Sequence, residues 1–281
     1  MGGYWRCVSA DDAKCSDFVW VDIVKTKTRL GQHFLTDGAS IERIVEAAQV
    51  EKEDLVVEIG PGRGALTDLL VERAGQVVAI EIDGALCDLL SDRFGSRLKI
   101  VSDDVRQVNL PALVEMSKSE KAILVGNLPY HITGALIRQI TDARRVWKRA
   151  VITVQREVGQ RMIAPPGSKI YGVLSVVTQV RCVAKRLFDL PPAHFYPRPK
   201  VHSSVLMLDF EANSAYDIAD ERRLFGVVRA AFQQRRKMVR NALSGVVDDE
   251  ILMEANIDGR ARPETISIDG FERICRALAV R

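Results

Sequence analysis

The chain has 281 residues, of which 47% are hydrophobic and 27% charged, with a formal net charge of +3. Such a composition is typical of a globular protein that buries a sizeable core. The longest apolar run near the N-terminus, residues 18–24, is interrupted by Asp22 and falls far short of the roughly 20 residues of a membrane span. With no secretory pattern either, we expect a cytoplasmic protein without a membrane segment.

The cysteines are scattered and carry no metal-binding pattern. The five cysteines form no CxxC pair and have no histidine at ligand spacing. We therefore expect neither a zinc site nor a disulfide framework, and free thiols fit a reducing compartment. Basic runs at residues 25–29, 144–149 and 235–240 fit phosphate binding, although each run alone is more often a solvated face.

The elements begin after an N-terminal extension, residues 1–24, which shows no pattern and which we expect to be partly disordered. Between residues 54 and 155, short apolar runs alternate with helix-like segments, which predicts βαβ units and a parallel sheet. The expected strands are Leu55–Ile59, Val77–Ile82, Leu98–Val101, Ala122–Val125 and Ala150–Val154. The expected helices between them are Ala65–Arg73, Gly84–Phe94 and Gly134–Ala143.

The pattern changes after Gly172. Val173–Cys182 and Val201–Phe210 have the character of longer strands and are expected to add antiparallel edges to the sheet. From residue 211 onward the spacing is helical, in Leu224–Phe232, Met238–Leu243, Ile251–Ala255 and Phe271–Leu278. The sequence thus predicts an α/β, Rossmann-like domain over residues 25–210 and a small all-helical domain over residues 211–281.

A glycine-rich loop directly follows the first predicted strand. Gly60, Gly62 and Gly64 permit a sharp turn and close approach to a ligand. Glu81, about 20 residues further on, stands where an acid accepts hydrogen bonds from ribose hydroxyls. Because GxGxG without GxGxxG suits a pyrophosphate poorly, we expect S-adenosylmethionine and not NAD. Asp104 is placed to accept from the cofactor's adenine amine, with a plain helix N-cap as the alternative.

The fourth strand ends in Asn-Leu-Pro-Tyr, at the edge where ligands of open α/β folds bind. An exocyclic adenine amine is a poor nucleophile because its lone pair is delocalised into the ring. Acceptors on both of its hydrogens, the Asn127 side-chain oxygen and the Leu128 carbonyl, favour a pyramidal nitrogen that can attack a sulfonium methyl. Pro129 fixes the turn, and Tyr130 is placed to stack on an extracted base. We expect N6-adenine methylation that needs no metal.

Aromatic and basic residues follow the last proline-rich turn. We expect Phe195 to sandwich the target base opposite Tyr130, while Arg198 and Lys200 contact phosphates. An aromatic ring packed on prolines is the alternative. The basic run Arg235-Arg236-Lys237 is expected to bind RNA in a salt-dependent way.

Six motifs stand in order along the chain: Leu30-Gly31-Gln32-His33-Phe34-Leu35, Glu58 to Gly64, Asn127 to Tyr130, Phe195 to Val201, Phe232-Gln233-Gln234-Arg235-Arg236-Lys237 and Arg262-Pro263-Glu264-Thr265. Together they resemble the ribosomal RNA adenine N6-dimethyltransferases of the KsgA type, from about Lys27 to the C-terminus. The resemblance implies an S-adenosylmethionine methyltransferase domain with a helical C-terminal domain. It also implies a substrate, two adjacent adenines in the 3′-terminal hairpin of 16S rRNA within the small-subunit precursor.

The resemblance also implies a set of cofactor contacts. Carried over residue by residue, the cofactor would be lined by His33, Leu35, Gly60, Glu81, Asp104 and Asn127. Two positions depart from the family pattern, because many members have asparagine at position 33 and glycine at position 103, where this chain has His33 and Asp103. We expect the protein to act as a monomer.

Three alternatives are open at this point. The nearest alternative is the related family that methylates a large-subunit adenine and confers macrolide resistance. The motifs at residues 232–237 and 262–265 favour the small-subunit family over it. A ribosome-assembly or RNA-binding factor without catalysis is a second, but binding alone does not require Asn127-Leu128-Pro129-Tyr130. An NAD-linked enzyme is a distant third.

Overall fold

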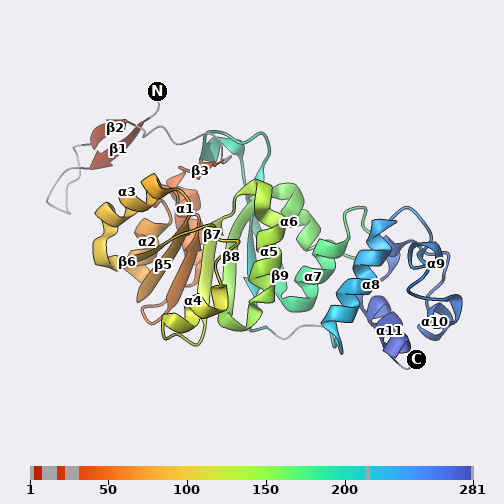
Figure 1. Cartoon of the computed structure of the whole chain (residues 1–281). Coiled ribbons are helices and arrows are strands. Elements are labelled where there is room, and N and C mark those ends of the chain that lie inside the picture. The colour runs from red at the N-terminus through yellow and green to blue at the C-terminus, as the bar shows by residue number, and fades with distance from the viewer. Residues whose placement is uncertain (1–2, 8–17, 23–31, 213–215, 280–281) are drawn as a thin grey trace. The chain divides into compact units, whose positions relative to one another are not determined.

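The computed structural model describes residues 3–7, 18–22, 32–212 and 216–279. Inside the predicted extension, β1 (Gly3–Cys7) and β2 (Phe18–Asp22) pair as a two-stranded antiparallel sheet. The rest of the extension and the basic run at residues 25–29 lie outside the described residues. From His33 onward the chain forms a separate compact unit, which contains every element described below (Figure 1).

The described residues of this unit build a seven-stranded sheet in the order β6-β5-β4-β7-β8-β11-β9. Neighbouring strands from β6 to β8 are parallel, and β11 runs antiparallel to both β8 and β9. The strands are β4 (Leu55–Ile59), β5 (Gln76–Glu81), β6 (Leu98–Ser102), β7 (Ala122–Asn127), β8 (Trp147–Gln155), β9 (Val183–Leu190) and β11 (Ser203–Asp209). The five predicted parallel strands are confirmed, and the expected antiparallel addition is made by β11.

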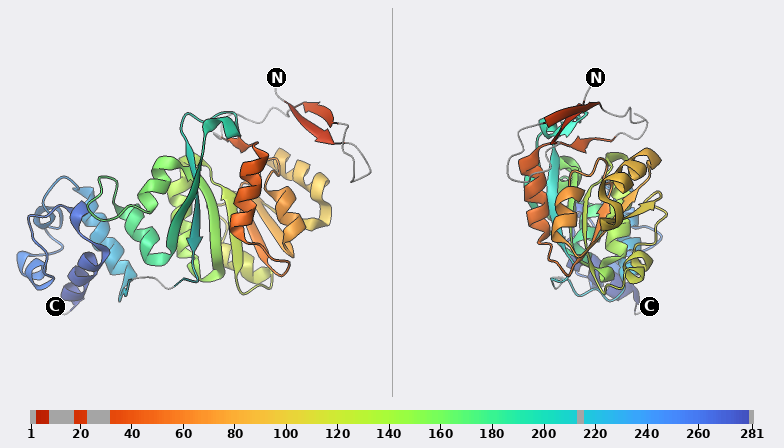
Figure 2. Two further views of the ribbon diagram at one scale, coloured as in Figure 1. Left: turned by 180° about the vertical axis from the view of Figure 1, so that it is seen from behind. Right: turned by 90° about the vertical axis from the view of Figure 1, so that its left-hand side faces the viewer.

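Helices cover both faces of the sheet. Side chains of β4 alternate between two apolar clusters, with Val57 in one and Val56 in the other, as a strand buried on both sides requires. The helix α5 lies in front of the sheet in Figure 1, and α1 lies in front of it in the rear view of Figure 2. The helices of this region are α1 (Gly38–Ala48), α2 (Thr67–Arg73), α3 (Gly84–Phe94), α4 (Leu110–Met116), α5 (Thr133–Asp142), α6 (Arg156–Met162) and α7 (Val173–Arg181).

The expectation of a strand at Val173–Cys182 is wrong, because α7 occupies most of this segment. Its valines favour strands locally, which is why the pattern misled. They also recur at helical spacing, however, and Val176 and Val180 are buried against the helical part of the chain, while Leu174 packs against the sheet's core. Two cores therefore hold α7 from different sides, and this tertiary contact outweighs the local preference.

The C-terminal part contains only helices among its described residues 216–279. Its helices are α8 (Glu221–Gln233), α9 (Val239–Ala242), α10 (Asp249–Glu254) and α11 (Ile268–Ala279). They surround a third apolar cluster, separate from the two beside the sheet, which includes the completely buried Phe271. The predicted all-helical character of this region is confirmed over these residues.

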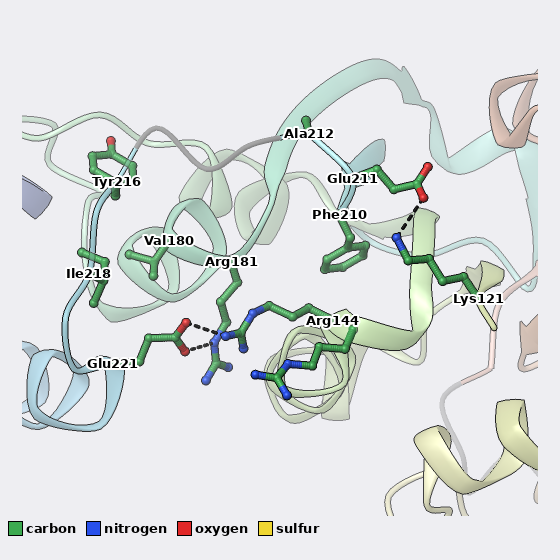
Figure 3. A pocket seen from close by; sticks show the side chains of 11 residues that line it. Lys121, Arg144, Val180, Arg181, Phe210, Glu211, Ala212, Tyr216, Ile218 and Glu221 are labelled. Atoms are coloured by element: carbon green, nitrogen blue, oxygen red, sulfur yellow. Dashed lines mark hydrogen bonds and ion pairs between the residues drawn. The ribbon is translucent and has the colours of Figure 1, made fainter.

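Ion pairs join the C-terminal helices to the rest of the unit. Glu221 at the start of α8 accepts from Arg144 (2.8 Å) and from Arg181 at the end of α7 (3.1 Å), as the dashed lines in Figure 3 show. Nearby, Lys121 pairs with Glu211 at 2.9 Å. Much of the basic run at residues 144–149 is thus engaged in structural contacts, since Lys148 pairs with the buried Asp54 at 2.6 Å. No helix among the described residues is both long and apolar enough to cross a membrane.

The packing of α7 predicts the effect of a cavity. Val176→Ala should lower the free energy of unfolding by about 2 kcal/mol, because it removes two methyl groups from a fully buried side chain. Chemical denaturation monitored by circular dichroism measures this change. Val246→Ala, at an exposed position in the helical region, is the control and should have little effect. Equal stability of the two variants would contradict the burial of Val176 in the helical core.

Candidate active site

Four of the predicted site residues lie at the carboxyl edge of the sheet. Gly60 follows β4, Glu81 ends β5, Asp104 lies after β6 and Asn127 ends β7. The order β6-β5-β4-β7 makes these strands neighbours, and the crossover direction reverses between β4 and β7. Open α/β sheets bind their ligands at such a reversal, because the connecting loops separate there.

The glycine loop adopts backbone conformations that other residues rarely take. Gly60, Gly62 and Gly64 have φ values of +67°, +59° and +85°. At Gly62 a Cβ atom would also lie 2.8 Å from the Phe34 ring. The loop therefore requires glycine for its turn, and at Gly62 for packing as well.

Glu81 is held by backbone amides. Its carboxylate accepts from the N–H groups of Gly62 (3.2 Å), Ile82 (3.0 Å) and Asp83 (3.0 Å). It has no ion-pair partner among the described residues, and burial raises the pKa of its carboxyl group. Because a carboxylate offers about four acceptor directions, one remains for a ligand hydroxyl. The structure thus fixes the Glu81 carboxylate against the glycine loop.

Glu58 is a buried acid that the sequence analysis quoted only as part of a motif. It is 1% exposed and accepts a hydrogen bond from the Thr67 hydroxyl at 2.7 Å. Burial is the main reason why its pKa is raised to about 8, with Asp68 and Glu81 adding to the effect. The carboxyl group is therefore mostly protonated at neutral pH. The available sequence signal was an acidic residue within the otherwise apolar strand Leu55–Ile59.

Asp104 is engaged by its neighbour Arg106. The two side chains form an ion pair with a shortest distance of 2.5 Å, and the Arg106 amide also donates to Asp104 at 3.0 Å. These hydrogen bonds, and more weakly His131, lower the pKa of Asp104. Asp104 is therefore an ionised acceptor, and its interaction with His131 places it near the segment that follows β7. Asp103 caps this turn by accepting from the Asp104 amide at 2.7 Å.

Asn127 has one polar atom satisfied and the other not. Its Nδ2 donates to the His33 carbonyl oxygen at 2.7 Å, whereas its buried Oδ1 has no hydrogen-bond partner among the described residues. Because a carbonyl can only accept, the amide nitrogen must face His33, and this fixes the direction of Oδ1. A buried acceptor without a donor costs on the order of 1–3 kcal/mol. This oxygen is therefore free to accept a hydrogen bond from a further donor.

The rest of the Asn-Leu-Pro-Tyr motif is held in place by hydrogen bonds. The Leu128 amide donates to the Thr153 carbonyl at 3.0 Å, which sets the direction of this peptide. The Pro129 carbonyl accepts from the Thr133 hydroxyl at 2.9 Å. The Tyr130 hydroxyl forms a hydrogen bond with the Ser203 hydroxyl at 2.5 Å, and burial raises the pKa of this phenol. The backbone of the motif is therefore rigid, and the ring of Tyr130 is anchored at its polar end.

Two short strands bring the N-terminal and proline-rich motifs together. β3 (Phe34–Leu35) pairs with β10 (Phe195–Tyr196), so that Leu35 lies opposite Phe195. Just before β3, the His33 ring bonds the Pro197 carbonyl through Nδ1 (2.7 Å) and lies 5.4 Å from the Tyr130 ring. The departure at position 33 thus leaves the contact with Asn127 intact, because that contact uses the backbone.

Phe195 is placed differently from its neighbour Tyr196. The Phe195 ring is 2% exposed and belongs to the core that also contains Leu35, whereas Tyr196 is 49% exposed. The ring that was expected to sandwich a base is thus covered by core side chains in this conformation. Alternation along the strand turns Tyr196 outward instead.

Gly126 is a site residue that the sequence analysis missed. It lies opposite Ile59 in the β4–β7 pair, and a Cβ atom on it would be 2.8 Å from the Ile59 carbonyl oxygen. Only glycine allows the two strand ends to approach so closely at this position, and a Cβ atom added to the neighbouring Gly60 would lie 3.6 Å from the Asn127 carbonyl oxygen. A glycine at the end of an apolar strand was the available signal.

The predicted RNA-binding residues separate into free and engaged side chains. Arg198, Lys200, Arg236 and Lys237 are exposed, and none of them has an ion pair among the described residues. Arg235 instead pairs with Glu264 at 3.2 Å and donates to the Lys169 carbonyl, so it links the last two motifs to the loop before α7. No cluster of three potential metal ligands occurs among the described residues.

Sequence comparisons with known proteins match ribosomal RNA methyltransferases. A family model described as ribosomal RNA adenine dimethylase matches residues 23–279. "Ribosomal RNA small subunit methyltransferase A" of Shouchella clausii is 39% identical, covering 90% of this chain and 89% of that protein. The protein of the same name from Moorella thermoacetica is 41% identical, covering 91% and 93%.

Solved structures give the same fold. A dimethyladenosine transferase from Plasmodium falciparum superposes with a TM-score of 0.74 at 22% identity, covering 86% of this chain and 96% of that one. The 23S rRNA methyltransferase ErmE superposes with a TM-score of 0.68 at 25% identity, covering 88% and 99%.

The burial of Glu58 predicts a pH-dependent stability. Its pKa is about 8 in the folded chain and near 4.3 in the unfolded chain, so the contribution to stability is fully present below pH 4.3 and is lost as the pH rises toward 8. Glu58→Gln keeps the acceptor for Thr67 but cannot ionise. We expect its thermal midpoint, relative to the parent, to rise between pH 5 and 8. Glu115→Gln, at an exposed position on α4, should show no such trend; a flat difference for both would refute this account.

Proposed function

The chain belongs to the ribosomal RNA adenine dimethylase family, and we propose that it dimethylates N6 of two adjacent adenines in the 3′-terminal hairpin of 16S rRNA. It is an S-adenosylmethionine-dependent RNA methyltransferase. Relatives named for the small subunit are 39% and 41% identical over about nine-tenths of this chain, which supports the small-subunit substrate. In this proposal a cytoplasmic monomer acts on a late small-subunit precursor during ribosome biogenesis, without a metal.

The unsatisfied Oδ1 of Asn127 carries the proposal. In an adenine, the amino group at N6 supplies the N–H donor that this oxygen lacks. A second acceptor, the Leu128 carbonyl, takes the other hydrogen, and together the two acceptors draw the nitrogen away from planarity. Its lone pair is then free to attack, so the residues stabilise the geometry of the transition state more than that of the free base. The proton can leave after transfer, and no general base is required.

The remaining site residues position the two reactants. Tyr130 stacks on the adenine, held in place by its bond to Ser203, and Pro129 fixes the turn that presents Leu128. A base must leave its helix to be methylated, so an aromatic surface compensates for lost stacking. Phe195 has its ring inside the core, and we propose that it contributes by anchoring β10 beside β3.

The carboxyl edge fits S-adenosylmethionine. Glu81 is a buried acceptor for ribose hydroxyls, and Asp104 is an ionised acceptor for the adenine amine. Gly60 and Gly62 leave the loop between β4 and α2 without side chains at these positions, so a ligand can approach its backbone. When bound, this cofactor supplies an electrophilic methyl group on a sulfonium. His33 and Leu35 would close the cofactor site from β3.

The two domains have separate parts in the proposal. Residues 25–210 form the methyltransferase domain and residues 211–281 the helical domain that helps to hold the RNA, while residues 1–24 are an extension outside both. Arg198, Lys200, Arg236 and Lys237 would contact phosphates. Arg235 would support this surface indirectly, through its pair with Glu264.

The role of Asn127 can be tested by substitution. Asn127→Ala should lower kcat for methyl transfer to small subunits by at least about 100-fold, since it removes an acceptor needed in the transition state. Binding of the RNA should fall by less than about threefold. Asn241→Ala, at an exposed position on α9, is the matched control and should retain full activity. Full turnover by the Asn127 variant would refute the mechanism.

The substrate can be tested directly. Purified small subunits from a strain without this modification should accept tritiated methyl groups from S-adenosylmethionine, and mapping should place the label on the two adjacent hairpin adenines. Large subunits under the same conditions are the control. Label on a large-subunit adenine, with the hairpin unmodified, would show that the proposed substrate is wrong.

A further inference from the structure

The exposed face of α8 carries a row of polar residues with two arginines. Arg222, Gly226, Arg229 and Gln233 are all exposed and follow one another at spacings of four, three and four residues. Such spacing places side chains on one face of a helix, opposite the buried face of α8. We call these four residues the α8 stripe. It spans about 16 Å along the helix axis.

The positive charge of the stripe is not balanced by ion pairs. The two acids at the start of α8 already have partners. Glu221 forms ion pairs with Arg144 and Arg181, and Asp220 caps the helix and pairs with Arg223. Arg222 and Arg229 have no ion pair among the described residues, so their charges are available to a partner.

Two residues of the stripe act against the stability of their own helix. Arg222 lies in the first turn, where the helix dipole disfavours a cation. Gly226 lies in the middle, where glycine costs helix stability relative to alanine. Its φ is not positive, and a Cβ atom on it would have no neighbour within 4 Å, so neither backbone nor packing requires glycine there. Residues that break local stability rules on one exposed face point to binding.

We propose that the α8 stripe binds the phosphate backbone of the substrate RNA, in addition to Arg236 and Lys237 in the segment that follows α8. The inference rests on the proposed function, which supplies the RNA. Arg222 and Arg229 neutralise phosphates, and Gly226 leaves a notch between them in which the backbone can approach the helix. None of the exposed large hydrophobic residues lies on α8, whereas the centres of protein interfaces are rich in apolar and aromatic side chains, so RNA fits this face better than a protein does.

The charge can be tested by binding at several salt concentrations. The probe is the purified small subunit from a strain without the modification. Arg222→Gln with Arg229→Gln should weaken binding about tenfold at low salt and reduce the slope of log affinity against log salt by about 1 to 2. Arg236→Gln with Lys237→Gln should behave alike. Lys99→Gln with Lys118→Gln, both exposed and without ion pairs among the described residues, is the charge-matched control and should change neither quantity.

The notch can be tested separately from folding. Gly226→Ala should raise the thermal midpoint by about 2–4 °C, because it improves the helix. Gly226→Gln should keep a midpoint at least as high as the parent's while weakening subunit binding about tenfold, since its side chain fills the notch. A purely structural glycine would instead lower the midpoint in both variants and leave the affinity of the folded protein unchanged, and this result would overturn the notch.

The outcomes separate the stripe from the proposed function. Unchanged affinity and slope in the Arg222 and Arg229 double variant would overturn the α8 stripe, even while the parent protein methylates the hairpin adenines. A loss of affinity that does not depend on salt would indicate a protein contact and would overturn it as well. Failure of the parent protein to methylate small subunits would reject the proposed function, whatever the variants bind.

Discussion

The hydrogen bond from Asn127 Nδ2 to the His33 carbonyl is the contact on which the rest of the site depends. It orients the amide so that Oδ1 faces the ligand, and it can form only if β3 lies beside the end of β7. The pairing of β3 with β10 holds β3 there, and the His33 ring adds its bond to Pro197. The end of β7, the segment around β3 and the segment around β10 are far apart in sequence, and together they fix the position of the Asn127 Oδ1 atom.

The carboxyl edge combines rigid backbone with buried acids. Gly126 lets β7 approach β4 without a clash, and the glycine loop is tied to Glu81 through the Gly62 amide. Burial raises the pKa values of both Glu58 and Glu81, but only Glu81 is surrounded by amide donors that favour its charged form. Glu58 therefore packs inside β4 as a neutral group, while Glu81 remains an acceptor for a ligand.

The helical region is joined to the sheet through shared packing and through charge. α7 contributes to both cores, and Arg181 at its end meets Glu221 at the start of α8. Further along the chain, Arg235 and Glu264 hold the loop before α7. In these contacts, some of the arginines and lysines that belong to basic runs in the sequence pair with acids from other segments. Only the remaining cations of these runs are free of ion pairs at the surface of the described part of the chain. RNA is expected to bind at these unpaired cations, such as Arg236 and Lys237, and not along the whole of each basic run.

The sequence by itself determined the parallel strands, the glycine loop and the position of Asn127-Leu128-Pro129-Tyr130 at a strand's end, because each depends on a local pattern: apolar runs, closely spaced glycines and a motif that follows such a run. The tertiary structure alone decided three things. It made Val173–Arg181 a helix, because two cores pack against its valines. It buried Phe195 and exposed Tyr196, because strand pairing sets which side faces inward. It also engaged Arg235 with Glu264, because a charge finds its partner only once distant segments meet.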